Sequence, residues 1–371
     1  MDALSLVMAN PPEHRSNMHA GKMDRSSANL LSRSRLSLKP GKFLPYSLHS
    51  SPYQSPYRLA KPYSLPGLAT YRRDSPARPP SRNIKSSTGS RKVLLEPQIR
   101  LGVGRKVGRI GKTQKEQSQD TYFDQCLGPC RLVGVCDGHG PLGHLVSAFL
   151  AEQLPKALFR KVVHKDVESL KAALVQAYSE CAKMLKATTF DTTASGSTCV
   201  SVLITNTDLI CANVGDCRAV VGRNIGGIWG LYQLSWDHKP DLPTEHRRIQ
   251  SYGGEVSAPR LGPARVFHKN KPFPGLSVSR ALGDDIAASA GVIAVPDVQA
   301  IRLADWDRFM IVASDGLWNV VNSMEAVSLV QPMLDQGVER AAEGLVDEAE
   351  RRWQQRTRGV DDITALVVLL Q

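Results

Sequence analysis

The chain has 371 residues, of which 42% are hydrophobic and 22% are charged, so it can bury a large core as one big domain or two ordinary ones. Its formal net charge is +12, and residues 1–92 carry all of it, with 16 Lys and Arg against 4 Asp and Glu. No apolar run approaches the roughly 18 residues of a membrane span, and the first residues lack the features of a secretory signal, so we expect a soluble or peripheral protein.

The first 92 residues are rich in Ser, Pro, Tyr, Arg and Lys and show no helical or strand period. Such a segment buries too little surface to offset its chain entropy, and we predict a disordered leader. It can dock on acidic partners, nucleic acid or anionic lipid, its Ser-Pro steps can be phosphorylated, and its composition also suits a transit peptide. We favour a solvated tail without a dedicated partner, followed by an ordered domain over residues 93–371.

The seven cysteines are odd in number and include no CxxC pair. This pattern favours reduced thiols in a reducing compartment over disulfides or a zinc site. We therefore expect a cytoplasmic or nuclear protein, with organelle targeting by the leader left open.

The ordered chain first reaches Lys115 and Asp120, a cation and a carboxylate just before an apolar pair, a pattern that taken alone indicates a surface turn. Residues 132–136 then predict a buried strand that ends in a turn of Asp137, Gly138, His139 and a further glycine. The glycines let the backbone approach a ligand, and the Gly138 carbonyl could bind a hard cation. On its own, this pattern is more often a tight turn than a metal or catalytic site.

Apolar spacing predicts core-facing helices over residues 145–163 and 167–185, the first of them kinked or restarted at Pro155. Residues 195–205 and 209–223 predict consecutive short strands, with Asp216 in a turn between two of them. We expect these strands to form a meander in a largely antiparallel sheet.

The last third of the chain alternates strands and helices. Pro243 is a suitable first residue for a helix that ends before residues 253–254. An apolar strand ends in Asp315, which we expect to repeat the geometry of the Asp137 turn. Asn322 and Glu325 predict a capping box for a helix over residues 324–334, a second helix follows over 338–353, and residues 363–370 predict a buried closing strand just after Asp361.

Four carboxylates therefore lie at junctions between apolar strands and turns: Asp120, Asp137, Asp315 and Asp361. Strand ends at one edge of a sheet can bring such residues together, and burying that much negative charge requires a counterion. Oxygen ligands without Cys or His suit Mg²⁺ or Mn²⁺ rather than zinc. Two such ions about 4 Å apart could hold a bridging hydroxide and clamp a phosphate for in-line attack.

Eight segments resemble the protein phosphatase 2C family in their order and approximate spacing, over about residues 101–371: VCDGHGPLGHLVSAFL, SGSTCVSVLI, ICANVGDCRAVVGR, LSWDHKPDLPTEHRRIQSYGGEV, LSVSRALGD, VIAVPDV, VASDGLWNVV and DDITALVVLL. The resemblance implies an α+β fold, a four-layer α/β/β/α sandwich in which helices flank two packed, mainly antiparallel sheets. It also implies a site for two Mg²⁺ or Mn²⁺ ions in the cleft between the sheets.

The resemblance also assigns roles to residues. Asp137 would bridge the two ions, the Gly138 carbonyl would bind one, and Asp315 and Asp361 would hold one of them, with Asp120 beside the pair through ordered waters. His139 matches the family's general acid for the leaving alkoxide. An alternative of equal weight is a turn histidine bonded to a carboxylate.

The sequence departs from the family pattern at several positions. Lys115 stands where many members use an arginine to grip the substrate phosphate, and Gln119 stands where some have Glu. Asn319 replaces an acid that, in some members, joins the residues matching Asp216 and Asp315 to hold a third ion, so Asp216 is only a candidate third-metal ligand. Cys217, where serine is usual, is interpreted as a buried small residue rather than a redox switch.

We therefore predict a monomeric, metal-dependent serine/threonine phosphatase that hydrolyses phosphoproteins by attack of a water bridging the two ions, without a phosphoenzyme. One alternative is a pseudophosphatase that binds phosphoproteins without turnover, which missing metal ligands would favour. Another is a scaffold that acts through its basic leader, and salt-sensitive binding by the leader alone would support it.

Overall fold

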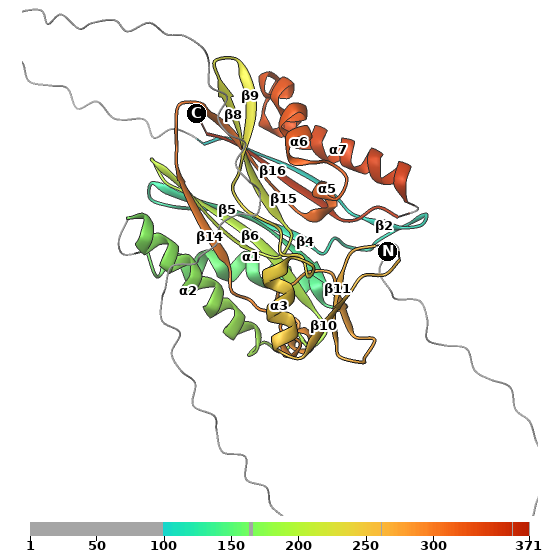
Figure 1. Cartoon of the computed structure of the whole chain (residues 1–371). Helices are drawn as coiled ribbons and strands as arrows, with labels where there is room; N and C mark the ends of the chain where they lie inside the picture. The colour runs from blue at the N-terminus through green and yellow to red at the C-terminus, as the bar shows by residue number, and fades with distance from the viewer. Residues whose placement is uncertain (1–98, 163–165, 261, 358, 371) are drawn as a thin grey trace, which may run out of the picture. The chain divides into compact units, whose positions relative to one another are not determined.

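The computed structural model describes residues 99–162, 166–260, 262–357 and 359–370 (Figure 1). The leader predicted over residues 1–92 lies outside the described residues. No helix in the described part of the chain is long and apolar enough to cross a membrane.

Two antiparallel sheets form the centre of the described domain. The first has the order β1 (Leu101–Lys106), β16 (Ile363–Leu369), β15 (Asp307–Ala313), β8 (Arg218–Ile225) and β9 (Ile228–Gln233). The second has the order β14 (Asp297–Arg302), β7 (Asp208–Val214), β6 (Gly196–Ile204), β5 (Cys130–His139) and β4 (Asp120–Leu127), with the short β13 (Leu282–Gly283) also on β6. The closing strand β16 is buried, as predicted.

Helices cover the outer face of each sheet (Figure 1). The first sheet carries α5 (Asp315–Trp318), α6 (Ser323–Val330), a 3₁₀ turn (Gln331–Gln336) and α7 (Val338–Arg356), of which α7 contacts β1 and β16. The second carries α1 (Gly143–Phe159) and α2 (Val167–Leu185), which contact β5, β6 and β7. One apolar core lies under each helical layer and a third lies between the sheets. The predicted four-layer α+β sandwich is confirmed.

Smaller elements flank the sandwich. They are the hairpin of β2 (Arg109–Ile110) and β3 (Thr113–Gln114), the helices α3 (Pro243–Ser251) and α4 (Asp285–Ser289), and a separate sheet of β10 (Gly254–Ser257), β11 (Arg265–His268) and β12 (Pro274–Leu276). A small apolar cluster that includes Ile249 and Val266 joins α3 and α4 to this sheet.

Most predicted elements are confirmed, including the helix over 167–185 and the capping box of Asn322 and Glu325. The chain does not restart a helix at Pro155, because α1 is one helix whose buried leucines hold it on the sheet across the proline. The meander is also wrong beyond β7. The chain crosses from one sheet to the other between β7 and β8, and because both strands are buried, their apolar pattern cannot distinguish a hairpin from such a crossover.

Two of the expected turns differ from the prediction. The strand β5 continues through Asp137 to His139, because β6 supplies partners along its whole length, and the chain turns only at Gly140, where φ is 81°. Asp315 does not repeat that geometry, since it is the first residue of the short helix α5.

Candidate active site

Two of the predicted carboxylates lie side by side across neighbouring strands. Asp120, the first residue of β4, is the register partner of Asp137 near the end of β5. The next residue, Gly138, is packed so closely that a Cβ atom would lie 2.2 Å from the Gly143 carbonyl oxygen. Only glycine therefore lets the start of α1 approach this strand end.

The carboxylates perturb one another strongly. Burial raises the pKa of Asp137 well above its usual range, and the charges of Asp120, Asp315 and Asp361 raise it further. Burial likewise raises the pKa of Asp315, with added repulsion from Asp216 and Asp361. The structure thus brings all four predicted metal-binding carboxylates, together with Asp216, within electrostatic range of one another.

Asp120 connects the two sheets. Its side chain is only 1% exposed, and the Ser314 hydroxyl, just after β15 of the other sheet, donates a 2.7 Å hydrogen bond to Oδ2. Burial raises the Asp120 pKa to about 7, and the Ser314 hydrogen bond and nearby Thr364 lower it only in part. Asp120 Oδ1 has no partner of hydrogen-bond geometry in the described part of the chain. A buried carboxylate oxygen without a donor is suited to a cation.

Lys115 is held by two adjacent aspartates. Its Nζ lies 3.3 Å from Asp361 Oδ1 and 3.0 Å from Asp362 Oδ2. Burial lowers the pKa of Lys115, but the charges of these two carboxylates outweigh burial and raise it overall. An ammonium has three N–H groups, so these contacts leave donor capacity for an incoming anion.

Asp362 differs from its neighbour in being nearly saturated with donors. Besides Lys115, its carboxylate accepts hydrogen bonds from the backbone N–H groups of Gly108, at 2.7 Å, and Gln119, at 3.0 Å. The Asp362 side chain is 4% exposed, whereas that of Asp361 is 41% exposed. Asp362 therefore fixes the segment before Asp120, while Asp361 faces the open side of the site.

The side chain of Gln119 has a structural partner. Its Nε2 donates a 2.7 Å hydrogen bond to the Gly140 carbonyl oxygen, in the turn that follows β5. A glutamate could not donate this bond when ionised, so the amide at this position suits the local geometry.

His139 is paired with a carboxylate that our sequence analysis missed. Its Nε2 lies 2.6 Å from Asp284 Oδ2, and Asp284 has a left-handed backbone with φ 51° immediately before α4. This contact orients the imidazole ring at the end of β5. The two expectations for His139 are compatible, since a histidine bonded to a carboxylate can also serve as a general acid.

Asp216 is paired with a lysine. It is 2% exposed, and its Oδ2 accepts a short hydrogen bond from Lys239 Nζ. Burial lowers the pKa of Lys239, but Asp216 and then Asp315 raise it overall. Nearby, Asn319 Nδ2 donates to Asp315 Oδ2 at 2.8 Å.

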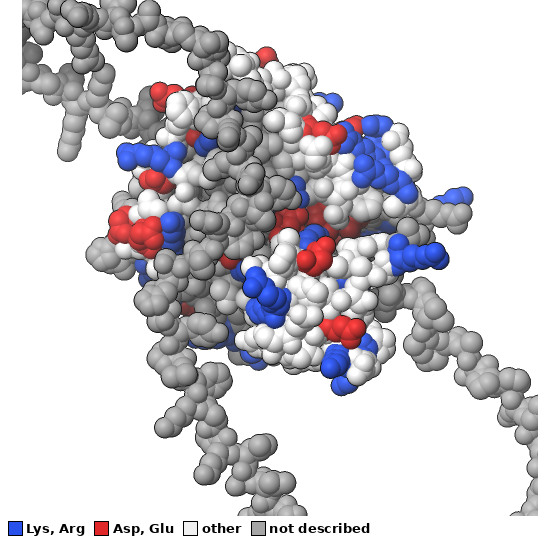
Figure 2. Space-filling view, viewed as in Figure 1, with Lys and Arg blue, Asp and Glu red and all other residues white. Residues whose placement is uncertain are grey.

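The charge on this face is uneven. In the space-filling view, acidic side chains gather near the middle of the face, with most Lys and Arg side chains around them (Figure 2). A phosphate would be repelled by such a centre unless cations neutralised it.

A family model described as "Protein phosphatase 2C" matches residues 110–356. The chain belongs to the protein phosphatase 2C family. It is therefore a serine/threonine protein phosphatase, a hydrolase whose family generally depends on Mg²⁺ or Mn²⁺.

Curated relatives agree with this assignment. The chain is 35% identical over 254 residues to "Probable protein phosphatase 2C 72" of Arabidopsis thaliana, covering 65% of this chain and 76% of that protein. It is 37% identical over 250 residues to "Probable protein phosphatase 2C 64" of Oryza sativa subsp. japonica, covering 64% of this chain and 58% of that protein.

Solved structures share the fold. A serine-threonine phosphatase 2C from Toxoplasma gondii is similar with a TM-score of 0.65 at 23% identity, over 74% of this chain and 96% of that one. A C. elegans sex determining protein is similar with a TM-score of 0.62 at 23% identity, over 74% of this chain and 65% of that one.

The ligand atoms that this phosphatase 2C site offers are suited to hard divalent cations. Aspartate oxygens predominate, and Asp120 Oδ1 has no hydrogen-bond donor among the described residues. Divalent charge would also relieve the repulsion that, after burial, raises the pKa of Asp137. Within the described ranges, no three His, Cys, Asp or Glu side chains are arranged as a metal-binding group. Ion pairs with lysines help to explain this, because Asp361 directs an oxygen toward Lys115 and Asp216 directs one toward Lys239.

Cys217 is fully buried, as the sequence predicted. Its Sγ lies 3.1 Å from the Thr198 hydroxyl, and burial, followed by the charge of Asp137, raises the pKa of the thiol well above its usual range. All seven cysteines lie in the described part of the chain, as thiols rather than in disulfides. A buried thiol with a raised pKa is poorly reactive, which argues against a redox role for Cys217.

Four residues of this phosphatase 2C site were missed from sequence: Ser314, Asp362, Asp284 and Lys239. Two of them could have been inferred from the sequence, because Asp362 and Asp284 each belong to a pair of adjacent aspartates. In such a pair one carboxylate can bond to the backbone while the other contributes to the site. Ser314 and Lys239 could not, since each acts on a carboxylate that is distant along the chain.

Proposed function

We propose that this phosphatase hydrolyses phosphoserine and phosphothreonine in proteins with two Mg²⁺ or Mn²⁺ ions. The observation that carries the proposal is the group of mutually repelling carboxylates, one of which has a buried oxygen that no donor in the described ranges reaches. Asp137, Asp315, Asp361 and the Gly138 carbonyl would hold the ions, with Asp120 beside them. When bound, the ions supply a nucleophilic water at neutral pH and neutralise charge on the phosphoryl oxygens.

The chain's own residues would bind and orient the substrate. The Lys115 ammonium, already positioned by Asp361 and Asp362, has donor capacity for a phosphate oxygen at the rim of the site. As a point charge it would contact one oxygen rather than grip two, as an arginine does.

His139 would supply the proton to the leaving serine or threonine oxygen. His139 ends β5 two residues after Asp137, so its imidazole would project to the same face of the sheet as that carboxylate, and the contact with Asp284 would restrict its rotation. Buried Asp120 would hold its position through Ser314, which also bonds to the Thr364 backbone and so ties the carboxylate to both sheets.

We also propose that residues 93–371 form the catalytic domain and residues 1–92 a separate leader, which can contact acidic partners or anionic surfaces. Supporting this boundary, β1 begins at Leu101 and pairs along its length with the closing strand. Phosphoprotein substrates follow from the family, and we propose a monomer located in the cytoplasm or nucleus.

The test is hydrolysis of a phosphothreonine peptide by the purified chain with Mn²⁺, with Mg²⁺ or with a chelator. We expect phosphate release with the ions and loss of release with the chelator. Equal release in chelator would refute metal dependence. Peptide binding without release under any condition would instead indicate a pseudophosphatase.

A further inference from the structure

The loop after β9 brings a partly buried cation into the acidic site. Lys239 lies on this loop, and its ammonium contacts Asp216 Oδ2, on the crossover between β7 and β8. The Lys239 side chain is 28% exposed and that of Asp216 is 3% exposed, so the pair is largely withdrawn from water. A charge pair at this depth is only weakly screened.

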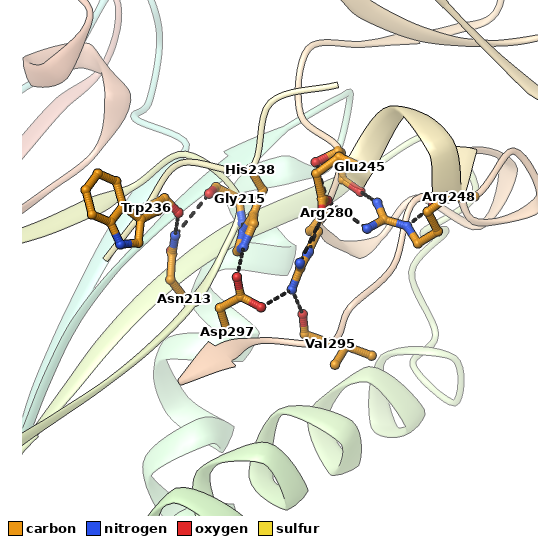
Figure 3. A network of polar contacts seen from close by, with 11 residues as sticks. Asn213, Gly215, Trp236, His238, Glu245, Arg248, Arg280, Val295 and Asp297 are labelled. Carbon is orange, nitrogen blue, oxygen red and sulfur yellow. Dashed lines mark hydrogen bonds and ion pairs between the residues drawn. The ribbon is translucent and has the colours of Figure 1, made fainter. Parts of the chain in front are cut away.

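Hydrogen bonds fasten the Lys239 loop to the Asp216 crossover (Figure 3). The backbone N–H of His238 donates to the Gly215 carbonyl at 2.9 Å, and the N–H of Gly215 donates to His238 Nδ1 at 3.1 Å. Asn213 Nδ2 donates to the carbonyl oxygens of Gly215 and Trp236, at 3.1 and 2.9 Å. The residues just before Lys239 and Asp216 are thus bonded directly to each other.

Further polar contacts connect His238 to Asp297, Arg280 and Glu245 and so support this junction (Figure 3). Since His238 Nδ1 accepts the Gly215 N–H, the ring proton lies on Nε2, which donates to Asp297 Oδ2 at 3.2 Å. Asp297 also accepts from Arg280 at 2.7 Å, and Arg280 pairs with buried Glu245 of α3 at 2.9 Å. Such a connected, well-paired network favours one position of the Lys239 loop.

Two anions, Asp315 and Asp137, lie within electrostatic range of Asp216, and a nitrogen donor also engages the first of them. At the position following Trp318, Asn319 presents its Nδ2 to Asp315 Oδ2, where an acid would present a further negative oxygen. Asp216 and Asp315 therefore each have one carboxylate oxygen engaged by a nitrogen donor of this chain.

We propose that the Lys239 ammonium is a built-in counterion for Asp216 and stands in the place of an additional metal ion. This inference rests on the proposed function, because it concerns the same carboxylate site. Asp216 then contributes no ligand to the ions that drive hydrolysis, and Lys239 acts as a positioning residue that limits how many ions the site takes.

The test counts the ions bound when Mn²⁺ is titrated into the metal-stripped full-length protein, with free Mn²⁺ measured by electron paramagnetic resonance. Lys239→Met removes the ammonium while keeping most of the side-chain volume. We expect this variant to bind one ion more than the parent, and we expect a further Asp216→Asn substitution to abolish that gain. Lys161→Met is the matched control, because Lys161 is 23% exposed and pairs with Glu180 away from the site, so its ion count should equal the parent's.

An acid at position 319 separates the effect of Lys239 on the ion count from the effect of Asn319. Asn319→Asp alone should leave the ion count unchanged, because Lys239 still engages Asp216. Asn319→Asp combined with Lys239→Met should bind the additional ion at least tenfold more tightly than Lys239→Met alone, since an anionic ligand is gained. An additional ion in Asn319→Asp alone would overturn the inference.

A single-site variant keeps the inference testable if Lys239→Met does not fold. Asp216→Asn in the otherwise unchanged chain should bind as many ions as the parent, and a lower count would show that Asp216 already holds a metal. A folded Lys239→Met protein that binds no additional ion would also overturn the inference. If the parent binds no ion at all, the proposed function fails as well, so the two failures are distinguishable.

Discussion

Substitution of Asp362 by Asn should destabilise the protein by about 3–5 kcal/mol, the cost of breaking a buried, hydrogen-bonded charge pair. The carboxylate accepts bonds from Gly108 N on Oδ1 and from Gln119 N and Lys115 Nζ on Oδ2. An amide has one accepting oxygen, so either of its orientations turns an NH₂ group toward at least one of these donors. An unpaired buried donor costs about 1–3 kcal/mol, and each lost bond to a charged group costs a similar amount.

The assay is urea unfolding at equilibrium in the presence of chelator, with the slope of the transition compared between variants. Asp361→Asn is the matched control, because it is the adjacent carboxylate but is 41% exposed and is repelled by its neighbours. We expect it to change the unfolding free energy by less than about 1 kcal/mol, as at other exposed sites, while losing phosphatase activity. An Asp362→Asn protein within 1 kcal/mol of the parent would refute the anchoring role of Asp362.

Three further expectations follow from the site and the domain boundary. Lys115→Ala should lower kcat/KM by about tenfold to a hundredfold, mainly through KM. A partly desolvated phosphate contact contributes about 1.5–3 kcal/mol in both the ground state and the transition state. A change within twofold would show that Lys115 does not contact the phosphate. In chelator, the contribution of Asp120 to the unfolding free energy should be complete below its unfolded pKa near 3.8, and on the order of 4 kcal/mol of it should be lost as pH rises through about 7. The increase in unfolding free energy caused by Mn²⁺ should therefore become larger between pH 5 and pH 7. An increase independent of pH would contradict the raised pKa. Removal of residues 1–92 should leave cooperative melting and hydrolysis of a small aryl phosphate intact, whereas loss of the melting transition would show that the boundary is misplaced.

The sequence predicted which carboxylates gather, because Asp120, Asp137, Asp315 and Asp361 all adjoin apolar strands whose ends meet at one side of the sheets. It could not predict how the chain passes between those sheets at the Asp216 crossover. Strands buried on both faces have the same apolar pattern in a hairpin and in a crossover, and only packing of the whole chain decides between them.

The supporting contacts were harder to predict than the carboxylates themselves. Lys239 meets Asp216 and Ser314 meets Asp120 across long stretches of chain, and no local pattern encodes such a pair. The different roles of the adjacent residues Asp361 and Asp362 could not be predicted from the sequence either. Both residues are aspartates in one turn, yet three donors on Asp362 make it an anchor and leave Asp361 facing the open side of the site.

The measurement that tests the central claim most directly is the kcat/KM of Asp137→Asn and Asp315→Asn on a phosphothreonine peptide, taken together with the bound metal content of each variant. The claim that these carboxylates hold the catalytic ions predicts loss of most activity and of bound Mn²⁺, with the cooperative melting transition retained. Full activity in either variant with unchanged metal content would contradict it.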